Sequence, residues 1–120
     1  MIDPQYSMEN LYQLIQQNIQ ENTKQNNSYS GVLLLDVRTP EEYAEGHIKG
    51  SRNVSHEEVM VKAPELKPEL ENFNKVIIYC RSGKRSQMAH NALEAQGLSN
   101  LLCICNSGMQ DWLDQGLPIE

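Results

Sequence analysis

A cysteine followed at once by cations and a glycine is the part of this sequence best suited to chemistry. Cys80 follows the apolar run Lys75–Tyr79 and precedes a short segment of Arg81, Ser82, Gly83, Lys84, Arg85 and Ser86. The apolar run is typical of a buried strand, so Cys80 is predicted where that strand ends and a loop begins. A cysteine exposed to such a loop can serve as a nucleophile.

The residues after this loop predict a helix. Ser86 is its expected N-cap, Gly97 lies beyond its end, and its apolar face comprises Met88, Ala89, Ala92 and Leu93. A strand, a tight loop and a helix can turn several backbone N–H groups toward one point, and the helix adds the positive end of its dipole. These groups, with the three loop cations, favour the thiolate of Cys80 over the thiol. The alternative is a buried strand cysteine beside a solvated charged turn.

The loop resembles the active loop of the rhodanese (sulfurtransferase) family, which begins with a cysteine at a strand end. The matching residues are Cys80-Arg81-Ser82-Gly83-Lys84-Arg85 in the loop, Leu35–Arg38, Glu42-Tyr43 and Gly46–Val54 upstream, and Gly108–Trp112 with Gly116–Pro118 at the close. The resemblance extends from about Ser7 to Ile119. Asn106-Ser107-Gly108 departs from it, because the family more often has a glycine pair there, so the backbone before the last helix is expected to differ.

This resemblance implies a single-domain sulfurtransferase that works through a Cys80 persulfide. The donor would be a small anion such as thiosulfate, and the acceptor would be cyanide in an assay or a thiol or protein in the cell. Backbone N–H groups of residues 81–86 would stabilise the persulfide, and Gly83 would permit close approach. Arg81, Lys84 and Arg85 would receive the donor. No metal or organic cofactor is implied.

Two other classes of function stay open. A non-enzymatic persulfide carrier or a regulatory binding module would use the same loop for a protein partner. A phosphatase or arsenate reductase would need an arginine six positions after the cysteine, and that position holds Ser86. Arg85 falls one residue early, so the loop has the short form that is associated with sulfur and disfavours these enzymes.

Asp36 and Arg38 follow a second predicted strand and could approach the pocket, since ligands of parallel sheets bind beyond the carboxyl ends of the strands. A structural salt bridge between them is an equal alternative. His47 and His90 are interpreted as hydrogen-bonded structural imidazoles rather than bases.

Cys103 and Cys105 alternate onto one face of a predicted strand, which indicates core positions more than resolving thiols. Their Cys-Ile-Cys spacing lacks the usual pattern of a zinc site, and the sequence contains no second cluster of ligands. No metal site is therefore expected.

Strands alternate with helices along the chain, which predicts an α/β fold with a mainly parallel central sheet and helices on both faces. The expected elements are a helix from Ser7, a strand over Gly31–Val37, a short helix from Thr39 to near Gly46, a strand over Arg52–Val54, a short helix from Ser55, a strand over Lys75–Tyr79, the helix from Ser86, a strand over Leu101–Cys105 and a helix over Gln110–Gln115.

Local signals support several of these elements. The first helix carries an apolar stripe of Leu11, Leu14, Ile15 and Ile19. Thr39 and Glu42 form a capping box with Pro40 at the first helical position. Pro64 and Pro68 are expected to break up the segment before Phe73. The polar stretch from Glu21 to Ser30 is interpreted as a linker.

Length and charge agree with a small cytoplasmic protein. The 120 residues suit one domain over 1–120, with 1–6 as a flexible N-terminus, and no apolar run is long enough to span a membrane. Three cysteines do not form a disulfide framework, which fits a reducing compartment. The net charge is −6 although three cations lie in one loop. An acidic protein of this kind is not expected to bind nucleic acid, whereas a small anion is expected to bind at the cationic loop.

Overall fold

The computed structural model describes residues 6–21 and 31–120, with the backbone alone described for 17–21. The predicted flexible N-terminus, except for Tyr6, and the linker from residue 22 onward lie outside the described residues, as does the side chain of Ile19. The elements are α1 (Met8–Glu21), β1 (Val32–Asp36), α2 (Pro40–Glu45), β2 (Ser51–Asn53), α3 (His56–Leu70), β3 (Lys75–Tyr79), α4 (Lys84–Glu94), β4 (Leu101–Cys103) and α5 (Met109–Asp114).

The described strands form one four-stranded sheet in the order β2-β1-β3-β4, and every neighbouring pair is parallel. The α/β prediction is confirmed. In the register of the sheet, Asp36 at the end of β1 lies opposite Tyr79 on one side and Asn53 on the other. The carboxyl ends of three strands, and the residues that follow them, therefore meet at one edge.

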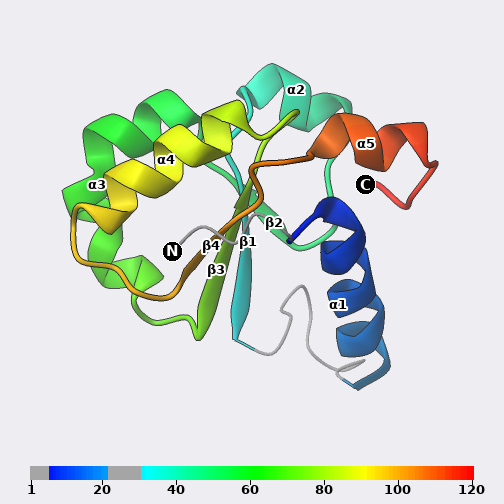
Figure 1. Cartoon of the computed structure of the whole chain (residues 1–120), viewed down its shortest axis with the longest axis horizontal. Helices are drawn as coiled ribbons and strands as arrows, with labels where there is room; N and C mark the ends of the chain where they lie inside the picture. The colour runs from blue at the N-terminus through cyan, green and yellow to red at the C-terminus, as the bar shows by residue number, and fades with distance from the viewer. Residues whose placement is uncertain (1–5, 22–30) are drawn as a thin grey trace.

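Helices cover both faces of this sheet, as predicted. Figure 1 shows α3 and α4 on one side, α1 and α5 on the other, and α2 at the carboxyl edge of the sheet. Each face has its own apolar cluster: Leu35, Ile78 and Leu93 belong to the α3/α4 side, and Leu34, Ile77 and Trp112 belong to the α1/α5 side. Adjacent residues of β1 and β3 point to opposite faces, so continuous apolar runs are needed in both strands.

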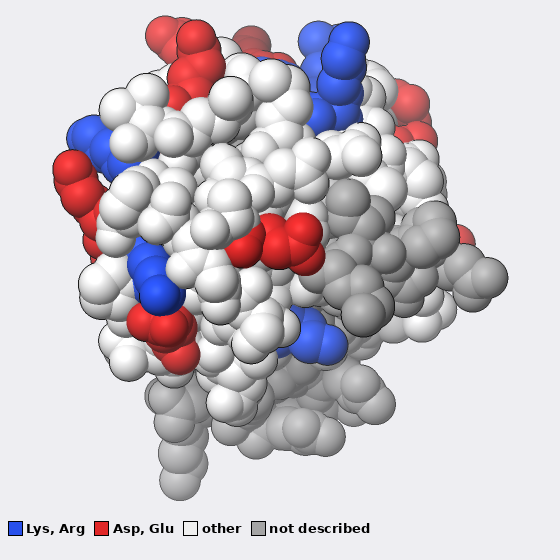
Figure 2. Space-filling view, turned by 60° about the vertical axis from the view of Figure 1, so that its left-hand side comes forward, with Lys and Arg blue, Asp and Glu red and all other residues white. Residues whose placement is uncertain are grey.

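The α3/α4 side has a mixed surface. Figure 2 turns this side forward and shows Lys and Arg side chains interspersed with Asp and Glu among uncharged residues. Met60 and Met88 are among the larger apolar side chains exposed on α3 and α4.

The capping box predicted for α2 is confirmed. Thr39 Oγ1 accepts the backbone N–H of Glu42 at 3.2 Å, and Glu42 Oε1 accepts the backbone N–H of Thr39 at 3.1 Å. Pro40 occupies the first turn, where its missing N–H has no cost, and the helix ends before Gly46. These bonds hold the Glu42 side chain at a fixed place above the carboxyl edge of the sheet.

The prediction for the segment after Ser55 is wrong in its length. Ser55 is the N-cap, but α3 continues for 15 residues through both Pro64 and Pro68. Each proline removes one helical hydrogen bond, and both lie on the exposed side of the helix, where water can replace it. The opposite side buries Val59, Ala63 and Leu70, and this packing outweighs the lost bonds.

Two further details differ from prediction. Met88 was expected on the apolar face of α4, but its side chain is 41% exposed, while Ala89 and Leu93 are buried. The last strand ends at Cys103, two residues early, because the chain leaves the sheet to pass behind the loop that follows β3.

The two prolines of α3 yield a stability prediction. Pro64→Ala restores a helical N–H at an exposed site, so we expect the free energy of unfolding in urea to rise by about 1–2 kcal/mol after allowing for the more flexible unfolded chain. Glu65→Ala, at the neighbouring exposed position, should change it by less than about 0.5 kcal/mol. A loss of stability in Pro64→Ala would mean that the proline shapes the helix for its packing.

Candidate active site around Cys80

Cys80 lies immediately after β3 and has no exposed surface. Its Sγ atom accepts two backbone N–H groups, from Gly83 at 3.1 Å and from Ser86 at 3.3 Å. The strand end therefore presents the sulfur to a concave loop of donors, as the sequence predicted. N–H groups that converge on one atom stabilise negative charge there.

Gly83 makes this loop possible in two ways. Its φ is +111°, a left-handed conformation that residues with a side chain rarely adopt. A Cβ at this position would also lie 2.3 Å from the carbonyl oxygen of Cys105. Any larger residue would push the loop away from the segment after β4.

Ser86 is not the N-cap of the helix, which corrects the prediction. Gly83 is the N-cap, α4 begins at Lys84, and Ser86 lies in the first turn. Its Oγ lies 2.8 Å from the carbonyl oxygen of Gly83 and 2.6 Å from that of Ile104, so the hydroxyl donates to one of them at a time. The left-handed Gly83 starts the helix earlier than a serine cap would, and this turns the Ser86 N–H onto Cys80.

The segment before α5 supports the loop from behind. The N–H of Met109 donates to the carbonyl of Cys80 at 2.8 Å, and the N–H of Gln110 donates to the carbonyl of Arg81 at 3.1 Å. A Cβ on Gly108 would lie 2.3 Å from the Arg81 carbonyl oxygen, so only glycine fits. Gly108 alone allows this close approach, so a glycine pair is not needed. The neighbouring Ser107 uses its hydroxyl to accept the N–H of Met8. Sequence reasoning missed this contact.

The three loop cations have different surroundings. Arg85 forms a two-pronged ion pair with Glu42, with Nη1–Oε1 at 2.7 Å and Nη2–Oε2 at 3.2 Å. Hydrogen bonds from Arg85 lower the pKa of Glu42 to about 2, and the same bonds raise the pKa of Arg85. Arg81 is exposed and donates to the side chain of Gln110, and Lys84 is exposed. The sequence did not reveal the partner of Arg85.

Asp36 and Arg38 form the salt bridge that the sequence left as an alternative. Arg38 Nη2 lies 2.8 Å from Asp36 Oδ2, and both side chains are buried. Arg38 also donates to the carbonyls of Glu42 and Gly46, so this pair anchors α2 to the end of β1. Removing either partner of a buried, hydrogen-bonded ion pair leaves an unpaired buried charge and strongly lowers the stability of the fold.

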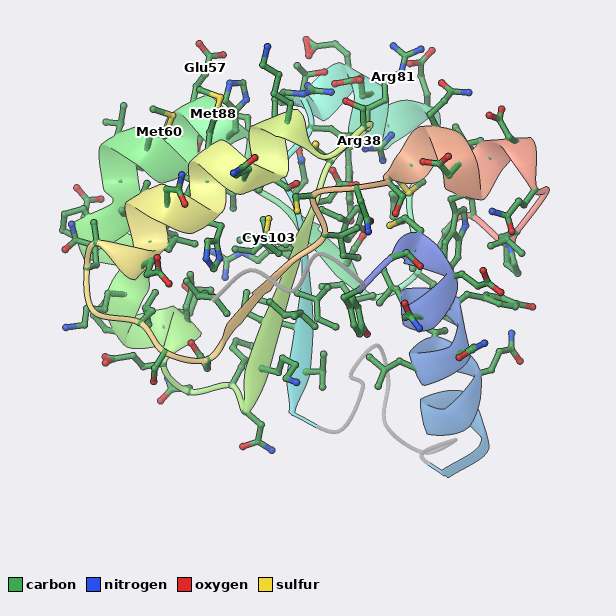
Figure 3. All side chains as sticks on the ribbon, viewed as in Figure 1. Arg38, Glu57, Met60, Arg81, Met88 and Cys103 are labelled. Atoms are coloured by element: carbon green, nitrogen blue, oxygen red, sulfur yellow. The ribbon has the colours of Figure 1, made fainter. Side chains whose placement is uncertain are left out.

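Arg38 also borders a hollow of about 210 Å³ beside the loop. Figure 3 shows Arg38 and Arg81 at the end of the sheet where α2 and α5 approach each other. The residues around the hollow are Arg38, Glu42, Glu45, Gly46, Arg81, Met109, Gln110 and Leu113. Cys80 is not among them.

The two histidines differ from each other. His47 Nδ1 lies 3.0 Å from the carbonyl oxygen of Tyr43, and the rings of the two residues stack at 3.8 Å, which confirms a structural role in the turn. His90 is buried, and its Nε2 lies 3.6 Å from Glu94 Oε2, which is just beyond hydrogen-bond distance. Neither ring nitrogen forms a hydrogen bond among the described residues, so the expected hydrogen bond is not observed there. Burial lowers the pKa of His90.

Cys103 is a core residue, as predicted, whereas Cys105 lies beyond the strand and is partly exposed. Figure 3 shows Cys103 between α4 and the sheet. Burial raises the pKa of the Cys103 thiol to about 11, against a smaller opposite effect of the Ser86 hydroxyl. Cys103 is thus a neutral thiol near pH 7.

Among residues 6–21 and 31–120, no group of His, Cys, Asp and Glu side chains is arranged to hold a metal ion. Within the same part of the chain, no helix has the length and apolar character that crossing a bilayer requires.

Comparison with known proteins places this geometry in a family. The profile of the rhodanese-like domain matches residues 13–115. The chain belongs to the rhodanese-like domain family. A sulfurtransferase of Allochromatium vinosum is 36% identical over 73% of this chain and 78% of its own length. A thiosulfate:glutathione sulfurtransferase of Saccharomyces cerevisiae is 36% identical over 71% of this chain and 67% of its own length.

Other relatives of this rhodanese-like domain point to further uses of the fold. YrkF of Bacillus subtilis, which is named as a sulfur carrier protein, is 39% identical over 66% of this chain but only 40% of its own length. A rhodanese-related protein of Thermoplasma volcanium has a TM-score of 0.62 at 30% identity and covers 85% of this chain and 90% of its own. A protein of Rhodopseudomonas palustris, described as a possible tyrosine phosphatase, has a TM-score of 0.75 at 26% identity, covering 95% and 82%.

The raised pKa of Cys103 yields a prediction about reactivity. With a folded pKa of about 11, this thiol stays protonated at pH 8, so iodoacetamide should leave it unmodified in the native protein. In urea it should be alkylated, and peptide mass mapping distinguishes the two states. The neutral buried thiol also stabilises the fold below about pH 9, and this contribution is lost as the pH rises through 11. Rapid native alkylation of Cys103 would show that the core opens.

Proposed function

We propose that this domain transfers sulfane sulfur from a small anionic donor such as thiosulfate to a thiol or protein acceptor through a persulfide on Cys80. The observation that carries the proposal is the pair of backbone N–H groups, from Gly83 and Ser86, on the Sγ of a cysteine at a strand end. The relatives named as sulfurtransferases support sulfur transfer as the general activity. The choice of thiosulfate is part of the proposal.

In the first half-reaction the Cys80 thiolate attacks the outer sulfur of thiosulfate. The bond between the two thiosulfate sulfurs breaks, its electron pair leaves with sulfite, and Cys80 holds a persulfide anion. The N–H groups around the loop stabilise the negative charge before and after the step, because the charge moves outward by one sulfur only.

In the second half-reaction a nucleophilic acceptor attacks the outer sulfur of the persulfide. Cyanide would give thiocyanate, and an acceptor thiolate would give a new persulfide, with the Cys80 thiolate as leaving group in both cases. Because Cys80 has no exposed surface, side chains around the loop must move for either step. The same enclosure would shield a stored persulfide from other thiols.

The structure is also compatible with a carrier, which would receive and deliver sulfur through protein partners alone. The similarity to YrkF favours this second candidate. Both functions need the same loop, so they differ in whether small donors and acceptors react at useful rates. The described cysteines form no disulfide, in keeping with the reducing, cytoplasmic compartment that we propose.

The loop is less suited to phosphate. Ser86 stands where a phosphatase would place its arginine, and its hydroxyl and N–H are already directed at loop atoms and Cys80. A tetrahedral phosphoryl group needs more donors and more room than a terminal sulfur. The likeness to the Rhodopseudomonas palustris protein therefore indicates a shared fold.

Thiosulfate should add the mass of one sulfur atom to the intact protein. We expect the adduct in the wild type and its absence in Cys80→Ser, because Cys80 is the cysteine whose sulfur accepts the N–H groups of Gly83 and Ser86. Cys103→Ser is the matched control that keeps the adduct. Intact-protein mass spectrometry, before and after addition of cyanide or glutathione, measures both half-reactions. An adduct that persists in Cys80→Ser would move the chemistry to another cysteine. Loading without any discharge to small acceptors would favour the carrier.

Phosphate esters should be very poor substrates. With Ser86 in place of the arginine, we expect the hydrolysis of p-nitrophenyl phosphate to be at least about 100-fold slower per enzyme than sulfur transfer to cyanide, since one missing stabilising donor typically costs about 100- to 1,000-fold. Release of p-nitrophenol is followed by its absorbance, with Cys80→Ser as the blank. Efficient release that depends on Cys80 would contradict the proposed sulfur chemistry.

A further inference from the structure

The ion pair between Arg85 and Glu42 has a consequence for the choice of donor, and this inference rests on the proposed function. We propose that Glu42 is a specificity-determining residue, which neutralises one loop cation and thereby disfavours doubly charged donors relative to singly charged ones. The substrate class that this arrangement fits is a monoanionic sulfane-sulfur compound, such as a thiosulfonate or a low-molecular-weight persulfide.

The geometry of Glu42 makes it a fixed feature of the site. Its Oε1 accepts the N–H of Thr39 and lies 3.1 Å from the Thr39 hydroxyl, and both carboxylate oxygens meet the guanidinium of Arg85. The two side chains of the ion pair are each only 24% exposed. The helix cap already fixes the conformation of the Glu42 side chain, so pairing with Arg85 costs little additional conformational entropy.

The position of Arg85 gives the pair its influence. Arg85 is in the first turn of α4, directly before Ser86, whose N–H binds Cys80 Sγ. A charge on Cys80 raises the pKa of Arg85, after the larger effect of the hydrogen bonds to Glu42. Because Arg85 and Glu42 form one ion pair, a donor at Cys80 would be attracted by the first and repelled by the second at similar distances.

The offset depends on the charge of the donor. A dianion is repelled by the Glu42 carboxylate about twice as strongly as a monoanion at the same distance. Arg81 and Lys84 are exposed and still attract anions of either charge. The net effect is a loop that binds anions but has a reduced preference for the more highly charged ones.

Two donors that differ by one charge test this directly. Thiosulfate is a dianion, and methanethiosulfonate has a methyl group in place of one oxygen and is a monoanion. Cys80 thiolate attacks the outer sulfur of either, the sulfur–sulfur bond breaks, and the leaving group is sulfite in the first case and methanesulfinate in the second. The product on the protein is the same Cys80 persulfide, so one mass shift reports both.

The informative variant is Glu42→Gln, because glutamine removes the charge but keeps an acceptor for the helix cap. We expect its second-order rate constant for loading Cys80 to rise about 5-fold with thiosulfate and about 2-fold with methanethiosulfonate at low salt. The gain is larger for thiosulfate because the repulsion that the variant removes is proportional to the charge of the donor. Raising the salt to about 0.5 M should shrink both gains. Loading is followed by intact mass at donor concentrations far below saturation.

Glu41→Gln is the matched control. Glu41 precedes Glu42 on α2, is exposed, and undergoes the same change in charge. We expect it to leave the ratio of the two rate constants unchanged within about 1.5-fold, because an exposed charge is screened. Glu42→Ala serves as a second variant without the amide and should shift the ratio in the same direction as Glu42→Gln.

The outcomes separate this inference from the proposed function. If the wild type loads but the ratio of thiosulfate to methanethiosulfonate rates is unchanged or lower in Glu42→Gln and Glu42→Ala, the specificity role is wrong and the sulfur chemistry stands. If neither donor loads the wild type, the proposed function fails first. An equal rise in Glu41→Gln would reduce the effect to overall charge and overturn the assignment to Glu42.

Discussion

The close approach of two backbone segments is the constraint on which the rest of this structure depends. The loop after β3 packs directly against residues 105–110, with Gly83 against the carbonyl of Cys105 and Gly108 against that of Arg81. Because Gly83 and Gly108 have no side chains, the N–H groups of Met109 and Gln110 can approach and bind the loop carbonyls. With its carbonyls turned outward and bound, the loop is left with N–H groups that point inward at Cys80.

Local signals in the sequence predicted most of the fold. The apolar runs of β1 and β3 and the capping box at Thr39 depend on neighbouring residues, and the structure confirms them. The prediction failed for α3, because Pro64 and Pro68 do not end the helix that begins after Ser55. Whether a helix survives a proline depends on which side meets solvent and on what packs against the other side, and α4 supplies that packing from a distant part of the chain.

The sequence also predicts the contiguous part of the candidate site. The strand end, Gly83 and the cations are contiguous, so one motif placed them around Cys80. The partners that give these residues their roles are not contiguous: Glu42 is 43 residues from Arg85, and Gln110 is 29 residues from Arg81. A single sequence has no local pattern that pairs such positions. Ser86 is not the cap because Gly83 takes that position in a left-handed conformation, which the residue type permits but does not require.

The loop separates two electrostatic tasks that the sequence appeared to combine. Backbone N–H groups hold the sulfur, and they are neutral, fixed and insensitive to salt. Arg81 and Lys84 are exposed to solvent, and among the described residues the sulfur accepts its hydrogen bonds from backbone N–H groups rather than from the loop cations. In the proposed mechanism the backbone N–H groups of Gly83 and Ser86 would stabilise the sulfur anion, so Glu42 could balance the charge on Arg85 without weakening the hold on the persulfide. If the inference about Glu42 holds, one residue of α2 would set which donor charge is preferred, while the proposed chemistry at Cys80 would stay the same.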